Sequence, residues 1–222
     1  MKFSFRFVII AALFVTCLLT ANIVGVKVFR LAGSITLPAA VILFPLTYIL
    51  GDILTEVYGY KQARRVIWLG FLGNLLFVLV AWVGRILPPA LDWGWQGAYE
   101  DILGYTPRLL AASFIGYLGG EFGNSFVLAK MKILTQGRWL WGRTISSTII
   151  GQGLDTALFI PIAYYGASFF TPMMILYHLG VKVLIEVVFT PFTYAVVNYL
   201  KKREMIDTFD YETNFNPFSV ID

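Results

Sequence analysis

Cysteine, histidine and charge are all scarce in this chain of 222 residues. Cys17 is the single cysteine, there is one histidine, and only 14% of the residues are charged. One cysteine excludes an intrachain disulfide, and one histidine cannot build a metal site by itself. The sequence also lacks HExxH, GxSxG and Walker motifs, so it carries no signature of a metalloprotease, a serine hydrolase or a nucleotide hydrolase. We therefore expect no enzymatic activity, no cofactor and no bound metal.

Apolar residues make up 58% of the chain. A soluble domain of this size could not cover so much apolar surface, whereas a lipid bilayer solvates it. We predict an all-α integral membrane protein with six transmembrane helices, because a span needs about 20 residues. The spans are expected at residues 7–29, 36–56, 65–87, 107–129, 144–166 and 173–200. They form a transmembrane domain over residues 1–203, followed by a cytoplasmic tail over residues 204–222.

Basic residues are distributed unevenly between the two sides of the predicted bundle. One side would carry those near the N-terminus and those after the second, fourth and sixth spans, while the other would carry only Lys27, Arg30, Arg85 and Arg108. The positive-inside rule makes the richer side cytoplasmic, which places both termini in the cytoplasm. Because the basic residues flank apolar segments, the net charge of +4 indicates the lipid bilayer as a partner and not a nucleic acid.

Two symmetries are consistent with this organisation. Six helices divided into three plus three would give halves of opposite orientation, an inverted repeat found in many secondary transporters. The fourth span contains Gly116, Gly119, Gly120 and Gly123, a small-xxx-small spacing that lets a neighbouring helix approach closely. That neighbour can belong to the same chain or to a second copy, and we expect a homodimer.

Four ionisable residues lie well inside the predicted spans, where each costs about 2.5–3.5 kcal/mol at a helix centre. Such residues usually face a cavity, a partner or a transport pathway. Other polar and aromatic residues share their helix faces at spacings of three or four, and a carboxylate, an amide and an aromatic ring together suit a planar heterocycle. The predicted binding residues are Glu121, Asp155, Lys182 and Glu186, which are ionisable, with Asn22, Asn124, Gln152 and Phe159.

Structural roles compete with binding for several of these residues. Lys182 can neutralise Glu186 one turn away on its own helix, or it can pair with Glu121 or Asp155 across the bundle. A second group lies at the cytoplasmic end of the second span and just beyond it. Its members form either a gate or a loop salt-bridge cluster, and they are Asp52, Glu56, Arg64 and Arg65.

Ordered motifs extend over nearly the whole chain: Asp52-Ile-Leu-Thr-Glu56-Val-Tyr58-Gly59, Gly119-Gly120-Glu121-Phe-Gly-Asn124-Ser125, Gln152-Gly-Leu-Asp155-Thr156 and Lys182-Val-Leu-Ile-Glu186. Together they resemble the vitamin uptake transporter family, now usually called queuosine precursor transporters. The resemblance implies six helices in the bacterial cytoplasmic (inner) membrane. It also implies import of 7-deazaguanine bases such as 7-cyano-7-deazaguanine and 7-aminomethyl-7-deazaguanine.

The candidate residues suit a guanine-like base. Its N1–H and 2-amino groups are parallel donors that one carboxylate, Asp155 or Glu121, can accept together, and its O6 needs a donor from Asn124, Gln152 or Lys182. We expect a secondary carrier. The alternatives are a substrate-binding membrane subunit that works with a separate energising ATPase complex, and a structural protein whose buried charges only hold helices together.

Overall fold

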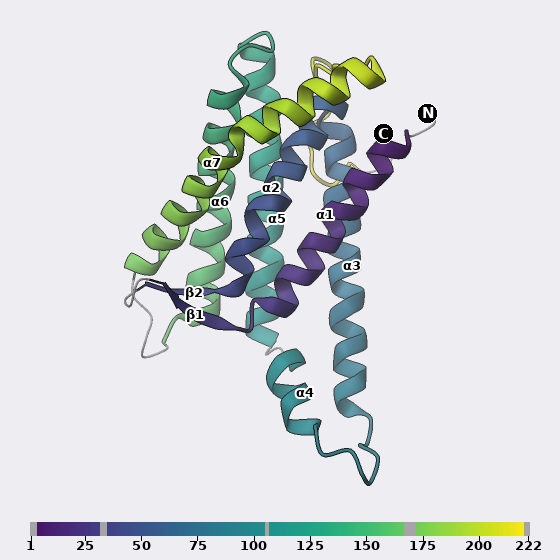
Figure 1. The fold of residues 1–222 in the computed structure, drawn as a ribbon, viewed down its shortest axis with the longest axis vertical. Helices are drawn as coiled ribbons and strands as arrows, with labels where there is room; N and C mark the ends of the chain where they lie inside the picture. Colours follow the sequence, from purple (N-terminus) through teal and green to yellow (C-terminus); the bar gives the residue numbers. More distant parts are fainter. Residues whose placement is uncertain (1–3, 32–34, 105–106, 167–171, 220–222) are drawn as a thin grey trace.

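Long helices packed side by side form the molecule (Figure 1). The computed structural model describes residues 4–31, 35–104, 107–166 and 172–219. Its long helices are α1 (Phe5–Val24), α3 (Tyr60–Ile86), α5 (Pro107–Leu134), α6 (Leu140–Tyr164) and α7 (Met173–Glu204). A shorter helix, α2 (Phe44–Ile53), follows the 3-10 turn η1 (Ala39–Ile42) and continues into the π-helical turn η2 (Leu54–Tyr58).

Five helical segments of the described residues are long and apolar enough to cross a membrane: Phe5–Val24, Ala39–Tyr58, Tyr60–Ile86, Leu140–Ala163 and Ile175–Glu204. A helical protein with several apolar spans is therefore confirmed. Helix α5 has sufficient length but is not among the five, because Glu121, Asn124 and several glycines lower the hydropathy of its middle. The sixth span, the side on which the termini lie and the inverted repeat remain predictions.

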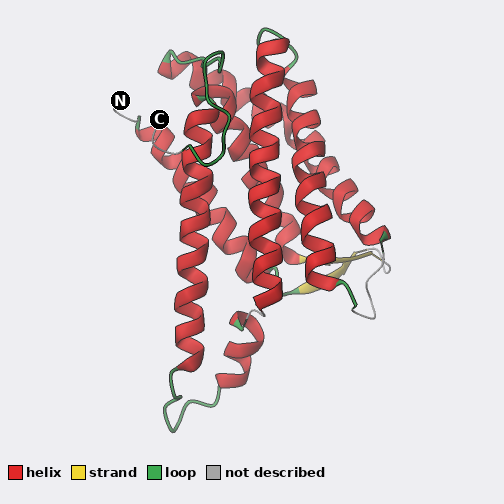
Figure 2. Ribbon diagram, turned by 180° about the vertical axis from the view of Figure 1, so that it is seen from behind, coloured by secondary structure: helices red, strands yellow, loops and turns green. Residues whose placement is uncertain are grey.

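A short β-hairpin separates α1 from α2. Strands β1 (Val28–Leu31) and β2 (Ile35–Pro38) pair antiparallel, with Val28 opposite Pro38 and Leu31 opposite Ile35 (Figure 2). The expected spans 7–29 and 36–56 ran a few residues into this hairpin, so those helix boundaries were wrong. Gly25 follows the last turn of α1, and β-branched residues beyond it favour extended backbone.

The start of α1 and the end of α7 lie together at one end of the bundle, where the Ser4 hydroxyl donates to Glu204 at 2.6 Å. The hairpin lies toward the opposite end, as does α4 (Gln96–Leu103), a short helix in the predicted loop between α3 and α5 (Figure 1). The hydroxyl of Tyr99 on α4 donates to the carbonyl of Ala81 on α3 at 3.0 Å, which fixes this loop against the bundle.

The interior of the bundle is divided into apolar and polar regions. Apolar side chains fill the region where α1, α2 and α3 meet, and they include Phe14, Leu18, Ile49, Ile53 and Ile67. Removal of apolar surface from water contributes about 25 cal/mol per Å². The packed core consists only of the apolar surface that is exposed neither to lipid nor to water. The polar residues lie instead between α2, α5, α6 and α7.

Helices α5 and α6 approach so closely that their glycines leave no space for side chains. A Cβ atom on Gly151 would lie 2.8 Å from the Gly120 carbonyl oxygen and 2.6 Å from the Cβ of Asn124. A Cβ on Gly120 would lie 3.1 Å from the Gly151 carbonyl oxygen. The small residues predicted to bring helices together therefore do so within one chain, and the homodimer remains a prediction.

We expect Gly151→Ala to lower the midpoint of thermal unfolding in detergent, because overpacking of this kind costs about 1–3 kcal/mol. Gly153 lies on the same helix, and a Cβ there would meet nothing within 4 Å. Gly153→Ala is thus the matched control and should leave the midpoint unchanged or raise it. Equal midpoints for the two variants would contradict the close packing of α5 on α6.

Candidate functional site

Buried polar side chains gather in the middle of the bundle on four helices. Helix α2 contributes two of them, α5 two, α6 three and α7 two. We call this group the central polar cluster, and it consists of Tyr48, Asp52, Glu121, Asn124, Thr148, Gln152, Asp155, Lys182 and Glu186. Burying so many polar groups is unfavourable unless each finds a partner, so their pairing decides what the cluster can do.

One ion pair crosses the cluster from α7 to α6. The Lys182 ammonium lies 2.7 Å from Asp155 Oδ2 and 3.5 Å from the Thr156 hydroxyl. Of the partners considered for Lys182, Asp155 is therefore the one that forms the ion pair. Glu186, on the same helix as Lys182, is not that partner. Lys182 also lies over the ring of Phe44, 5.1 Å from its centre, which further stabilises the ammonium group.

Two hydrogen bonds join α2 and its π-helical turn to α5. The amide nitrogen of Asn124 donates to Asp52 Oδ1 at 2.6 Å, and the hydroxyls of Thr55 and Ser125 lie 3.2 Å apart. Asp52 therefore belongs to the central polar cluster and not to a cluster at the end of the bundle. Tyr48 lies one turn before Asp52 on α2. The sequence interpretation missed Tyr48, although its spacing of four from Asp52 could have indicated it.

Many polar atoms of the central polar cluster have no hydrogen-bond partner. Each buried polar group left in this condition costs about 1–3 kcal/mol, and folded proteins leave few of them. Their concentration on four neighbouring helices is typical of a site that another molecule completes. The atoms are Tyr48 OH, Asp52 Oδ2, Glu121 Oε2, Asn124 Oδ1, Thr148 Oγ1, Gln152 Oε1, and Glu186 Oε1 and Oε2.

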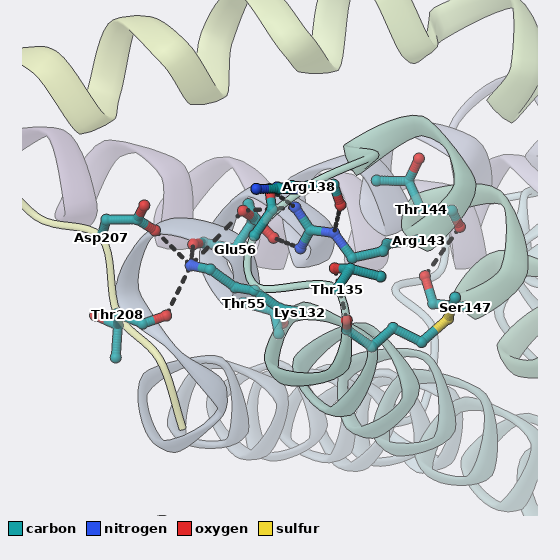
Figure 3. Close-up of polar contacts among 12 residues, drawn as sticks. Thr55, Glu56, Lys132, Thr135, Arg138, Arg143, Thr144, Ser147, Asp207 and Thr208 are labelled. Atoms are coloured by element: carbon teal, nitrogen blue, oxygen red, sulfur yellow. Dashed lines mark hydrogen bonds and ion pairs between the residues drawn. The ribbon is translucent and has the colours of Figure 1, made fainter. Parts of the chain in front are cut away.

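A second group of charges ties the helices together at the end of the bundle that holds the start of α1 and the end of α7. Glu56 on η2 accepts hydrogen bonds from both terminal nitrogens of Arg143 on α6, and its Oε1 lies 3.6 Å from Lys132 on α5 (Figure 3). The same oxygen lies 2.6 Å from Lys201 on α7. Asp207, just beyond α7, lies 2.5 Å from Lys132 and 2.9 Å from Lys201. We call these five residues the Glu56 cluster.

The Glu56 cluster carries three cations and two carboxylates, so Asp207 remains ionised. Partial burial alone would raise the pKa of the Asp207 carboxyl, but hydrogen bonds from Lys132 and Lys201 outweigh burial and hold this pKa below its usual value. A lowered pKa in the folded state means that the stabilisation is present above the ordinary carboxylate range. It is lost only as the pH falls through the lowered value, so the cluster is intact at neutral pH.

The group predicted from Asp52, Glu56, Arg64 and Arg65 does not form. Arg64, which is buried, donates to the carbonyl oxygens of Asn214 and Asn216 at 2.8 and 2.7 Å. Arg65 donates to the side chain of Gln62 at 3.2 Å. The cations that surround Glu56 come instead from α5, α6 and α7, far away in the sequence.

Two other predicted binding residues lie at the edge of the central polar cluster or outside it. The amide of Asn22 on α1 donates to Asn74 on α3 at 2.7 Å, away from the four helices of the cluster. Phe159 lies one turn beyond Asp155 on α6, and its Cβ would be 3.1 Å from a Cβ on Gly116. In the described residues, no three His, Cys, Asp or Glu side chains gather as a metal site requires.

The tail beyond α7 folds back over the start of α3. Besides the two carbonyls held by Arg64, the backbone N–H of Tyr60 donates to Asp210 at 3.0 Å, and the indole N–H of Trp68 donates to the carbonyl of Pro217 at 2.7 Å. Lys130 of α5 lies over the ring of Phe215, 3.9 Å from its centre. The tail is thus a fixed part of the structure and covers this end of the bundle.

Arg64→Met should release the tail, because it removes two charge-assisted hydrogen bonds worth about 1.5–3 kcal/mol each. We expect chymotrypsin to cut after Phe209, Tyr211 or Phe215 at least about tenfold faster in this variant, since cleavage follows local opening. Lys202→Met, which removes an exposed positive charge at the end of α7, is the control and should cleave at the wild-type rate. An unchanged cleavage rate in Arg64→Met would show that Arg64 does not hold the tail.

Residues 38–196 match the sequence profile of a family described as "Putative vitamin uptake transporter". This match covers more than half of the chain and includes every residue of the central polar cluster. The chain belongs to the vitamin uptake transporter family. The resemblance seen in the ordered motifs is thereby confirmed, and the central polar cluster of this transporter lies within the part of the chain that matches the family.

Two curated relatives are similar to this transporter over most of their lengths. It is 28% identical over 188 residues to the "Probable queuosine precursor transporter" of Bacillus subtilis (strain 168). The aligned residues cover 83% of this chain and 81% of the relative. It is also 28% identical over 166 residues to the "Queuosine precursor transporter" of Escherichia coli (strain K12), with 72% of each chain covered. No solved structure matches the transporter.

Proposed function

We propose that this protein imports a queuosine precursor, a 7-deazaguanine base such as 7-cyano-7-deazaguanine or 7-aminomethyl-7-deazaguanine, across the bacterial cytoplasmic membrane. The names of its two relatives and its family membership support this function. The observation that carries it in the structure is the group of unpartnered polar atoms in the central polar cluster. A flat base with donors and acceptors along its edges can satisfy several of these atoms at once.

The pairing within the cluster distinguishes the two carboxylates that could accept the N1–H and 2-amino groups. Asp155 is neutralised by Lys182 at 2.7 Å, whereas Glu121 Oε2 is buried without a partner. We therefore assign the base-reading role to Glu121. The Lys182 ammonium has three donors and can give one to O6 while it retains Asp155. Gln152, whose Oε1 is also unpartnered, would bind a further donor of the base.

Entry of a base requires the helices around the cluster to separate. Gly120 packs against the hydroxyl of Tyr48, and a Cβ there would lie 2.8 Å from the Cβ of Asp155. The site is therefore closed in this structure. We propose that it opens by alternating access, as in secondary carriers whose site lies near the bilayer midplane. In this proposal α5 is the sixth span and both termini lie in the cytoplasm.

The Glu56 cluster and the tail then close the cytoplasmic end. The cluster joins η2, α5, α6, α7 and the tail through ion pairs, so these elements cannot separate there without breaking it. It lies on the side rich in basic residues, which the positive-inside rule makes cytoplasmic. We propose that it is the inner gate, and that the structure represents a state closed toward the cytoplasm.

The test is uptake by the purified protein reconstituted alone in liposomes. We expect labelled 7-cyano-7-deazaguanine to enter, guanine to compete with it and adenine to compete poorly, because adenine lacks both the 2-amino group and O6. Failure of well-folded protein to bind or transport the deazaguanine would contradict the proposal. Uptake that appeared only with an ATPase complex and ATP would instead support the alternative of a substrate-binding subunit.

A further inference from the structure

Glu186 is a buried acid with which no Lys or Arg of the described part of the bundle forms an ion pair. It lies in the middle of α7 and is 1% exposed, and neither of its carboxylate oxygens has a hydrogen-bond partner. Lys182, one turn earlier, gives its charge to Asp155 at 2.7 Å. The base-recognition scheme above does not use Glu186, so the presence of an acid in so costly a position needs another explanation.

Of the neighbouring acidic groups, Glu186 on α7 acts most strongly on Asp52 of α2. Asp52 is fully buried, its Oδ1 accepts a hydrogen bond from Asn124 at 2.6 Å, and its Oδ2 has no partner. Helices α2 and α7 pack against each other, and the carboxylates of Asp52 and Glu186 lie close enough to interact electrostatically. Two unpartnered carboxylates therefore face the same region between α2 and α7.

The surroundings of this pair add negative charge and very little positive charge. Glu121 from α5 acts on Asp52 as a further negative group. Glu56 from η2 also acts on it, but the charge of Glu56 is matched by Lys132, Arg143 and Lys201. Asn124 is a neutral donor, and the nearest cation on α7, Lys182, is paired with Asp155. Two neighbouring carboxylates without a cation are costly to keep ionised together in a low-dielectric interior. One proton shared between them removes the conflict, because the protonated group becomes a donor and the other an acceptor.

We propose that Asp52 and Glu186 form the binding site for a single proton that drives import, separate from Glu121, which reads the base. This inference rests on the proposed transport function. The pair carries two negative charges when empty and one when loaded. In each cycle, one proton from outside binds together with one neutral base and both are released into the cytoplasm, so one positive charge moves inward. Alternating access exposes the pair to each side in turn.

The same oxygens, with Asn124 Oδ1, could also hold a sodium ion, since hard cations bind carboxylate and carbonyl oxygens. The test separates the two cations. Proteoliposomes are loaded at a defined pH with the membrane potential clamped, and steady-state accumulation of 7-cyano-7-deazaguanine is measured under a gradient of one pH unit. Coupling to one proton predicts accumulation of about tenfold, because one unit of pH is a tenfold gradient. A sodium gradient at equal pH should produce none.

Glu186→Gln and Asp52→Asn should reduce the accumulation ratio to about one, whatever happens to the rate of uptake. Asp101→Asn, an exposed acid on α4, is the control and should keep the wild-type ratio. A second measurement does not need transport: the infrared band of a protonated carboxylic acid should be present in the wild type at neutral pH and weaker in Asp52→Asn. Both variants should fold, because they replace a buried charge by an amide of the same shape.

Three outcomes would overturn the inference. They are accumulation by Glu186→Gln at the wild-type ratio, accumulation driven by sodium and not by protons, and absence of the protonated carboxyl band from the wild type. In each case, exchange of external for internal base would still show that the protein is a transporter. If the wild type neither binds nor exchanges the base, the proposed transport function fails, and the proton's role in import fails with it.

Discussion

Glu121→Gln is expected to weaken binding of 7-cyano-7-deazaguanine by about 10- to 150-fold, the largest effect on recognition of any single change in the cluster. The substitution replaces a carboxylate that can accept two parallel donors by an amide that accepts one and opposes the other. Hydrogen bonds to a charged group contribute about 1.5–3 kcal/mol, which corresponds to that factor. The fold should tolerate the change, because Glu121 Oε2 has no partner to lose.

Equilibrium binding to purified protein, with thermal unfolding of each variant beside it, measures this effect. Glu121→Gln should also lose the preference for guanine over adenine, which a purely structural role would not predict. Glu212→Gln, an exposed acid of the tail, is the control for charge. If well-folded Glu121→Gln binds normally while Asp155→Asn does not, the base is read by Asp155 and the assignment made here is wrong.

Glu56→Gln is expected to destabilise the protein by about 3–5 kcal/mol, the largest effect on stability that the ion pairs predict. The substitution leaves the buried Arg143 without its carboxylate partner, and removing one partner of a buried ion pair costs about this much. Lys132 loses its contact with Glu56 at 3.6 Å but retains Asp207 at 2.5 Å. Lys201 is less affected because it is 21% exposed and retains Asp207. The same change should loosen the inner gate and expose the end of the bundle to water.

Unfolding in a graded denaturant, followed by the fluorescence of the tryptophans, measures the change in free energy. Glu204→Gln is the matched control at the same end of the bundle. Its carboxylate lies 3.7 Å from Arg6, whose side chain is 44% exposed, so that ion pair contributes at most about 1 kcal/mol. The amide oxygen of the Gln can still accept the hydrogen bond from the Ser4 hydroxyl. Similar losses for the two variants would show that the Glu56 cluster is not a special element of stability.

The helical segments and the membrane class could be predicted from the sequence because they depend on local composition. A run of about 20 apolar residues is sufficient to indicate a span, and every predicted span overlaps a helix of the structure. The errors lie at the boundaries, where the hairpin replaces the end of one span and the start of the next. Short β-branched segments next to a helix are equally apolar in either conformation, so hydropathy could not separate them.

The grouping of Asp52 with Glu56 failed for a reason that lies in the backbone. A spacing of four places two residues on one face of an α-helix, but the chain changes into the π-helical turn η2 at Leu54. A π-helical turn contains more residues, so Glu56 does not repeat the direction of Asp52. One carboxylate enters the central polar cluster and the other receives Arg143 at the end of the bundle.

The sequence by itself determined that this protein belongs in a membrane, which segments are helical, and which ionisable residues the bilayer would force into the interior. It also determined the family, through motifs in a fixed order. Only the tertiary structure decided that Lys182 pairs with Asp155, that Glu121 Oε2 and both oxygens of Glu186 have no partner, and that Glu56 binds three distant cations. The reason is that these helices are apolar on nearly all sides, so the sequence pattern does not determine how each helix is rotated about its own axis. The close packing of helices such as α5 and α6 determines that rotation instead.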